Sequence, residues 1–217
     1  MPLTKHLFRK TAAKTIGCRY LAFLPAGYEA GRKRWPLILF LHGSRERGSN
    51  VELVKRHGLP KIVEQQPDFP FIVIAPQLPA REWWSPEILG GLLDEVQRKY
   101  RVDATRIYVT GLSMGGYGTW QLAVAYPHRF AAIAPICAGG ANFHRAPEIA
   151  HVPAWVFHGA RDKVVAISES REWVRRLRQA GGRPKFTIYP RAEHDSWTQA
   201  YDDPRLYRWF LQHRRAV

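Results

Sequence analysis

The chain has 217 residues, of which 46% are hydrophobic and 24% are charged. These values are typical of globular proteins and exclude a disordered or fibrous chain. The length favours one domain over two, so residues 1–217 are expected to form a single domain. The formal net charge is +15, but the Lys and Arg residues are scattered along the chain and form no recognisable nucleic-acid-binding module. We therefore expect no specific nucleic-acid partner.

The sequence predicts a cytoplasmic protein. It contains no apolar run long enough to span a membrane, and its basic N-terminus lacks the apolar stretch and cleavage site of a signal peptide. Its two cysteines, Cys18 and Cys137, lie in apolar, strand-like runs. Two cysteines are too few for a disulfide framework, so both are expected to be buried thiols. The oligomeric state is not indicated.

Short apolar runs alternate with helical patterns along most of the chain. The runs predict strands at residues 18–25, 37–41, 71–75, 106–110, 131–138, 154–158 and 185–189. Apolar residues recur at helical spacing in residues 88–96, 120–124, 173–177 and 206–210. This alternation predicts a mostly parallel sheet covered by helices on both faces. In such sheets the functional groups lie at the carboxyl ends of the strands.

The strongest chemical signal is the motif Gly111-Leu112-Ser113-Met114-Gly115, placed between a predicted strand and a predicted helix. A G-x-S-x-G motif in this position is typical of a nucleophile elbow, a tight turn that lifts a serine hydroxyl above the sheet. Gly111 and Gly115 would remove side chains that collide in such a turn. The alternative interpretation is an ordinary glycine-rich turn.

A serine nucleophile needs a general base and an acid that orients it. His194 is the candidate base because it follows the last predicted strand, late in the chain. Asp162 is the candidate acid, since it follows the strand at residues 154–158 and precedes His194 in the order that hydrolases use. Asp195 and Glu193 are the alternatives, but their side chains would tend to point away from the histidine that they flank.

Two further histidines, His42 and His158, each precede a glycine at the end of a predicted strand. We interpret both as residues that shape loops, with contact to substrate as the alternative. The oxyanion of the reaction would need hydrogen-bond donors. The expected donors are the backbone N–H groups of Met114 and Ser44. No His, Cys and carboxylate residues occur at metal-ligand spacing, so neither a metal nor another cofactor is expected.

Three tryptophans are candidate substrate-binding residues. Trp83 and Trp84 follow the strand at residues 71–75, at the sheet edge expected to carry Ser113. Trp197 comes three residues after His194. An aromatic ring beside a reacting centre offers a rigid apolar surface for an acyl or aryl group. The alternative is that these tryptophans are packing residues.

The chain contains the segments LHGSRERG, YRVDATRIYVTGLSMGGYGTW, HGARDKVV and EHDSW. As a set they resemble the compact bacterial carboxylesterases of the α/β-hydrolase superfamily. These are related to the phospholipase/carboxylesterase and feruloyl-esterase-like groups and to the hydrolase domains of prolyl-oligopeptidase-type proteins. The resemblance extends over residues 37–209.

The resemblance implies an α/β-hydrolase fold with a mostly parallel central sheet, helices on both faces and no large lid. It implies that Ser113, Asp162 and His194 form a catalytic triad and that Ser44 and Met114 donate to the oxyanion. The implied activity is cofactor-independent hydrolysis of a small-molecule carboxylic ester with a short or aryl group.

The chain departs from its relatives at Arg45, where they often have glycine. A cation at this position would narrow the site or favour acidic substrates. Two alternatives to an ester hydrolase remain open at this point. One is a peptidase or thioesterase that uses the same triad, and the other is a catalytically silent binding module.

Overall fold

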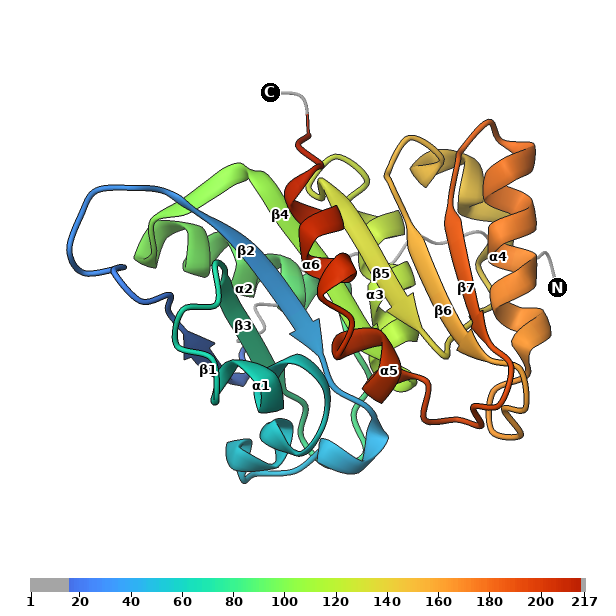
Figure 1. Ribbon diagram of the computed structural model, residues 1–217, viewed down its shortest axis with the longest axis horizontal. Helices are drawn as coiled ribbons and strands as arrows, with labels where there is room; N and C mark the ends of the chain where they lie inside the picture. The colour runs from blue at the N-terminus through green and yellow to red at the C-terminus, as the bar shows by residue number, and fades with distance from the viewer. Residues whose placement is uncertain (1–15, 216–217) are drawn as a thin grey trace, which may run out of the picture.

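The computed structural model describes residues 16–215. Its centre is a seven-stranded sheet (Figure 1). The strands are β1 (Arg19–Phe23), β2 (Trp35–Leu41), β3 (Ile72–Gln77), β4 (Val102–Leu112), β5 (Ala132–Ile136), β6 (Trp155–Gly159) and β7 (Lys185–Tyr189). Their order in the sheet is β1-β3-β2-β4-β5-β6-β7. β1 pairs antiparallel with β3, and the other neighbours pair in parallel. This confirms the mostly parallel sheet that the apolar runs predict.

Helices cover both faces of the sheet. In Figure 1, α1 (Gly58–Val63), α5 (Trp197–Tyr201) and α6 (Pro204–Leu211) lie in front of it, while α2 (Pro86–Lys99) and α3 (Met114–Ala125) lie behind. The side chains of α4 (Ile167–Gln179) belong to the same core as those of α2 and α3. Three short 3-10 helices complete the set: η1 (Ser44–Glu46), η2 (Val51–Arg56) and η3 (Phe143–Ile149). The connections within residues 16–215 are short and include no separate lid.

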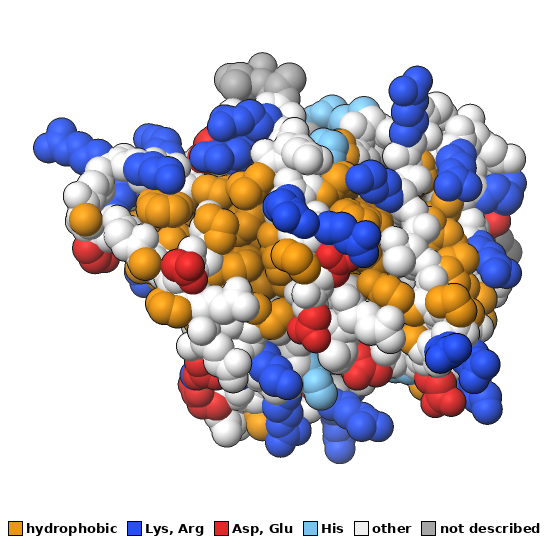
Figure 2. Space-filling model, viewed as in Figure 1, with side chains coloured by type: hydrophobic (Ala, Val, Ile, Leu, Met, Phe, Trp, Pro, Cys, Tyr) orange, Lys and Arg blue, Asp and Glu red, His pale blue; other side chains and the backbone are white. Residues whose placement is uncertain are grey.

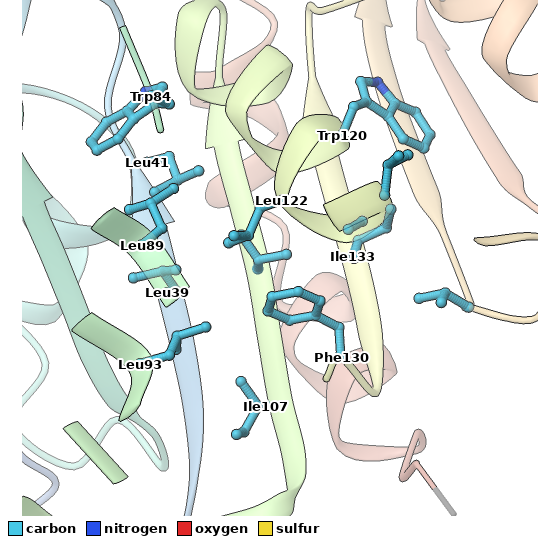
Figure 3. Close-up of a cluster of buried hydrophobic side chains, with 14 of the residues drawn as sticks. Leu39, Leu41, Trp84, Leu89, Leu93, Ile107, Trp120, Leu122, Phe130 and Ile133 are labelled. Atoms are coloured by element: carbon cyan, nitrogen blue, oxygen red, sulfur yellow. The ribbon is translucent and has the colours of Figure 1, made fainter. Parts of the chain in front are cut away.

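The sheet separates two hydrophobic cores. Along β2, Leu37, Leu39 and Leu41 face the core on the side of α2 and α3, and Ile38 and Phe40 face the opposite core. Figure 3 shows part of the first core, in which strand and helix side chains interdigitate. The alternation follows from the two-residue period of a strand. Both sets are apolar because helices cover both faces, which is why these strands read as continuous apolar runs.

The ends of the helices follow from their capping residues. The Ser85 side chain accepts a hydrogen bond from the backbone N–H of Ile88 and begins α2, with a proline at the next position. The Asp203 side chain caps α6 in the same way. Such caps satisfy N–H groups that have no acceptor within the helix. Gly181 follows the end of α4 with a φ of 84°, a conformation that glycine adopts without steric cost.

No helix within residues 16–215 is long and apolar enough to cross a membrane. Cys137 is buried, Cys18 is half-buried, and neither forms a disulfide. The Lys and Arg side chains on the face seen in Figure 2 are spread among acidic and apolar side chains and do not gather in one continuous patch.

The first core depends on large aromatic side chains. The rings of Trp120 and Trp173 stack in parallel with centroids 4.3 Å apart, which joins α3 to α4. We expect Trp120→Ala to lower the free energy of unfolding by about 3–5 kcal/mol, because it leaves a large cavity in a packed core. Trp83 is 61% exposed, so Trp83→Ala should change the free energy by less than about 0.5 kcal/mol. Urea unfolding of both variants measures the difference, and equal losses would contradict this account of the core.

Candidate active site

Ser113 lies at the turn between β4 and α3, in a strained backbone conformation. Its φ is 51° and its ψ is −119°, outside the regions that non-glycine residues usually occupy. The turn is held by hydrogen bonds from Ser113 N–H to the Ile136 carbonyl (3.0 Å) and from Gly116 N–H to the Ser113 carbonyl (2.8 Å). The strained residue therefore stands at the carboxyl end of β4 with its backbone fixed from both sides.

Two glycines permit this turn. A Cβ atom on Gly115 would overlap the carbonyl oxygen of Leu41 in the neighbouring strand β2. A Cβ atom on Gly111 would lie 2.7 Å from the same oxygen and would also overlap the Gly115 carbonyl. Because the obstructing atoms are backbone, they cannot move aside as a flexible side chain could. The two glycines of the motif are thus required by the close approach of α3 to β2.

The three predicted triad residues lie within hydrogen-bond distance of one another. His194 Nε2 is 2.9 Å from Ser113 Oγ, and His194 Nδ1 is 2.7 Å from Asp162 Oδ2. The three residues follow β4, β6 and β7, so the carboxyl ends of separate parallel strands bring them together. An ionised Asp162 only accepts hydrogen bonds, which makes Nδ1 the protonated nitrogen of neutral His194. Nε2 is then free to accept the proton of the Ser113 hydroxyl.

Asp162 is held as a carboxylate although its side chain is fully buried. Burial by itself would raise its pKa, but the hydrogen bond from His194 and those from the backbone N–H groups of Val165 (2.9 Å) and Val164 (2.8 Å) outweigh it, so the pKa of Asp162 is lowered. Asp195 points elsewhere, since its carboxylate accepts from the backbone N–H and the hydroxyl of Thr198, each at 3.0 Å.

His158 contacts the candidate acid, a contact that the sequence analysis missed. Its ring is fully buried, with Nε2 3.2 Å from Asp162 Oδ2 and 2.9 Å from the Val165 carbonyl, and Nδ1 2.7 Å from Ser170 Oγ. Burial lowers the pKa of His158, which favours the neutral ring. Both neighbours of Nε2 are acceptors, so the neutral ring carries its hydrogen on Nε2. Its position before Gly159 at the end of β6 was the only signal in the sequence.

The predicted oxyanion donors lie at two helix beginnings. Met114 is the first residue of α3, and Ser44 is the first residue of η1. The first N–H groups of a helix have no acceptor within it and carry the positive end of its dipole. The loop that holds Ser44 is fixed at Glu46, whose carbonyl accepts a hydrogen bond of 2.9 Å from the Gln77 side chain.

A cavity of about 500 Å³ opens beside Ser113 and His194. This size lies within the usual range of small-molecule sites. Besides these two residues, its lining consists of polar and apolar residues from five segments: Gly43, Ser44, Arg45, Glu46, His57, Leu112, Val164, Asp195 and Trp197. We call this cavity the Ser113 pocket. Of the three candidate tryptophans, Trp197 lines it.

The three tryptophans occupy different environments. The Trp197 ring lines the Ser113 pocket and meets the His194 ring edge-on, with centroids 5.4 Å apart. Trp84 is buried in the core, where its ring packs against that of His42 and its Nε1 donates to the His42 carbonyl at 3.3 Å. Trp83 is exposed, and neither Trp83 nor Trp84 is among the residues that line the pocket. Trp84 thus contacts the chain two residues before Ser44.

Two ionisable residues of the Ser113 pocket were not singled out from the sequence. Glu46 is almost fully buried, and burial raises its pKa, although His57 and nearby backbone N–H groups act in the opposite direction. His57 Nε2 lies 4.0 Å from Glu46 Oε1. Within residues 16–215, no group of three or more His, Cys, Asp or Glu side chains is arranged to hold a metal ion.

The chain is similar to known esterases and depolymerases. Residues 16–193 match the family described as "Putative esterase". A poly(3-hydroxyoctanoate) depolymerase of Pseudomonas fluorescens is 26% identical over 214 residues, covering 82% of this chain and 74% of that protein. A bifunctional acetylxylan esterase/xylanase of Neocallimastix patriciarum is 28% identical over 122 residues, covering 54% of this chain and 17% of that protein. The chain therefore spans a small part of the latter relative.

Solved structures show the same fold. A thermostable esterase superposes with a TM-score of 0.75 at 32% identity, covering 90% of this chain and 59% of that one. A ferulic acid esterase superposes with a TM-score of 0.67 at 20% identity, covering 88% of this chain and 89% of that one. The matches confirm the expected α/β-hydrolase fold, and the chain belongs to the esterase family.

Proposed function

We propose that this protein is a serine hydrolase that cleaves carboxylic esters through an acyl-enzyme on Ser113. The observation that carries the proposal is the hydrogen-bonded series from Ser113 Oγ through His194 to Asp162. The series has the geometry of a nucleophile, a general base and an orienting carboxylate. Membership of the esterase family supports an ester as the bond that is cleaved.

In this mechanism His194 takes the proton of the Ser113 hydroxyl as its oxygen attacks the acyl carbonyl. Asp162 stays ionised and stabilises the imidazolium that forms. The backbone N–H groups of Ser44 and Met114 stabilise the oxyanion, a contribution on the order of 3 kcal/mol for each donor. His194 then protonates the departing alcohol. It next activates a water molecule, which releases the acid and restores Ser113.

The favoured substrates are small esters with a short acyl or aryl group. The size of the Ser113 pocket and the Trp197 ring in its wall support this choice. A peptidase or thioesterase would use the same residues, and an activity screen on matched esters, thioesters and peptides distinguishes the three. A catalytically silent binding module is less well supported, because it would not need the hydrogen bonds that join the three residues.

We further propose that residues 1–217 act as a single domain in the cytoplasm, without a cofactor and without a specific nucleic-acid partner. Two cores that share one sheet support a single domain. Two free cysteines support a reducing compartment. The positive charge spread over the face seen in Figure 2 favours weak contacts with phosphates that salt would abolish.

We expect Ser113→Ala to lower kcat/KM for 4-nitrophenyl butyrate by about 10⁴-fold or more, since the variant has no nucleophile. Its thermal unfolding should resemble that of the unchanged protein, because the Ser113 side chain is not a packing residue. Steady-state kinetics and calorimetry measure the two effects. A folded Ser113→Ala protein with near-normal turnover would contradict the assignment of the nucleophile.

The two aspartates near His194 provide a matched pair of variants. Asp162→Asn should lower kcat by about 10⁴-fold, because an amide in place of the carboxylate favours the wrong tautomer of His194. Asp195→Asn removes only an exposed charge that accepts hydrogen bonds from Thr198, so it should lower kcat by about tenfold at most. Steady-state kinetics on both folded variants give the ranking, and the reverse ranking would move the role of acid to Asp195.

A further inference from the structure

The Ser113 pocket adjoins a second cavity at a single side chain. This cavity, of about 310 Å³, lies between α1 and α5, which are neighbours in Figure 1. Its lining residues include Lys61, Ile62, Gln65 and Tyr201. His57 is the residue that lines both this cavity and the Ser113 pocket. His57 therefore borders both spaces.

The second cavity continues into a third one. A third cavity, of about 290 Å³, shares Ile62, Gln66, Tyr201 and Asp202 with it and continues along α6 to Tyr207. The alkyl chain of a substrate that extended past His57 would thus find further space along the surface. Ile62 and Tyr201 supply apolar contacts to this space. Polar side chains line the rest of it: Lys61, Gln65, Gln66, Thr198 and Asp202.

The backbone at His57 is fixed by the core. His57 lies between η2 and α1, and the next residue, Gly58, has a φ of 66°. A Cβ atom on Gly58 would lie 2.7 Å from the Phe40 ring and 3.1 Å from the Tyr201 ring. The chain therefore turns tightly over two buried aromatic side chains at this point, and the position from which the His57 side chain projects is well defined.

The ring itself is held by contacts within the Ser113 pocket. It meets Trp197 edge-on with centroids 5.8 Å apart, and its Nε2 lies 4.0 Å from the Glu46 carboxylate. Trp197 in turn meets His194, so the three rings form one wall of the pocket. The His57 side chain is 43% exposed and makes no hydrogen bond to other described residues. Because the side chain is partly in solvent and makes no such hydrogen bond, its removal should disturb the core little.

We propose that His57 determines specificity by closing one end of the Ser113 pocket. The protein would then prefer esters in which the acyl or alcohol chain that points toward His57 is short. Without the imidazole ring, a longer alkyl chain would extend into the cavity between α1 and α5. This inference rests on the proposed ester hydrolysis. It adds the residue that sets the chain length and the space that a longer chain would occupy.

The test compares kcat/KM for long and short esters in two series: 4-nitrophenyl octanoate against butyrate for the acyl chain, and octyl against butyl acetate for the alcohol chain. Each methylene moved from water into apolar contact favours binding about fourfold. Four extra methylenes, partly buried, should therefore raise the long-to-short ratio of His57→Ala by about tenfold or more in one of the two series. His144→Ala removes an exposed histidine outside all these cavities and should leave both ratios unchanged.

A second variant tests where the longer chain goes. Gln65 is exposed and lines the second cavity but not the Ser113 pocket. Gln65→Trp should fill that cavity, so the double variant with His57→Ala should return the ratio to its original value. Thermal unfolding of each variant verifies that it is folded, and we expect little change because both side chains lie at the surface.

Two outcomes would overturn the proposal while leaving the proposed function intact. One is an unchanged ratio in both series for a His57→Ala protein that still hydrolyses the esters. The other is a raised ratio that persists in the double variant, because the chain would then not occupy the second cavity. An unsubstituted protein that hydrolyses none of the four esters would instead overturn the proposed function, and this inference with it.

Discussion

The arrangement of the site depends on how closely α3 approaches β2. The backbone of Gly115 packs against the carbonyl oxygen of Leu41 with no room for a Cβ atom. This contact forces the chain to leave β4 through one strained residue, and that residue is Ser113. The Ser113 hydroxyl is thereby raised at the carboxyl edge of the sheet. The same turn exposes the first N–H groups of α3, so one steric constraint places both the proposed nucleophile and a proposed oxyanion donor.

The second constraint is electrostatic. A carboxylate as deeply buried as Asp162 is stable only when hydrogen bonds replace the water that it has lost. Backbone N–H groups supply donors to one oxygen, and His194 and His158 face the other. The His194 ring is therefore oriented by the hydrogen bond that its Nδ1 makes to the buried Asp162 carboxylate. The parallel sheet makes this possible because it delivers Asp162 and His194 to the same edge as Ser113.

Much of the fold could be predicted because strands buried on both faces appear as apolar runs, and each of the seven runs overlaps a strand of the sheet. Helices α1 and α5 could not be predicted, because their six and five residues are too few to show a helical period. At the site, the G-x-S-x-G motif selected Ser113, and the order of residues along the chain selected Asp162 and His194. Chain order could not show that Trp84 turns into the core, nor that His57, distant in sequence from the triad, lines the pocket.

The central claim is that His194 activates Ser113 as a nucleophile. Reaction with a fluorophosphonate, followed by peptide mass spectrometry, tests it without any assumption about the natural substrate. We expect one covalent adduct, on Ser113, whose rate of formation falls by orders of magnitude in His194→Ala. An adduct on a different residue, or equally fast reaction of Ser113 in the unchanged protein and in His194→Ala, would contradict it.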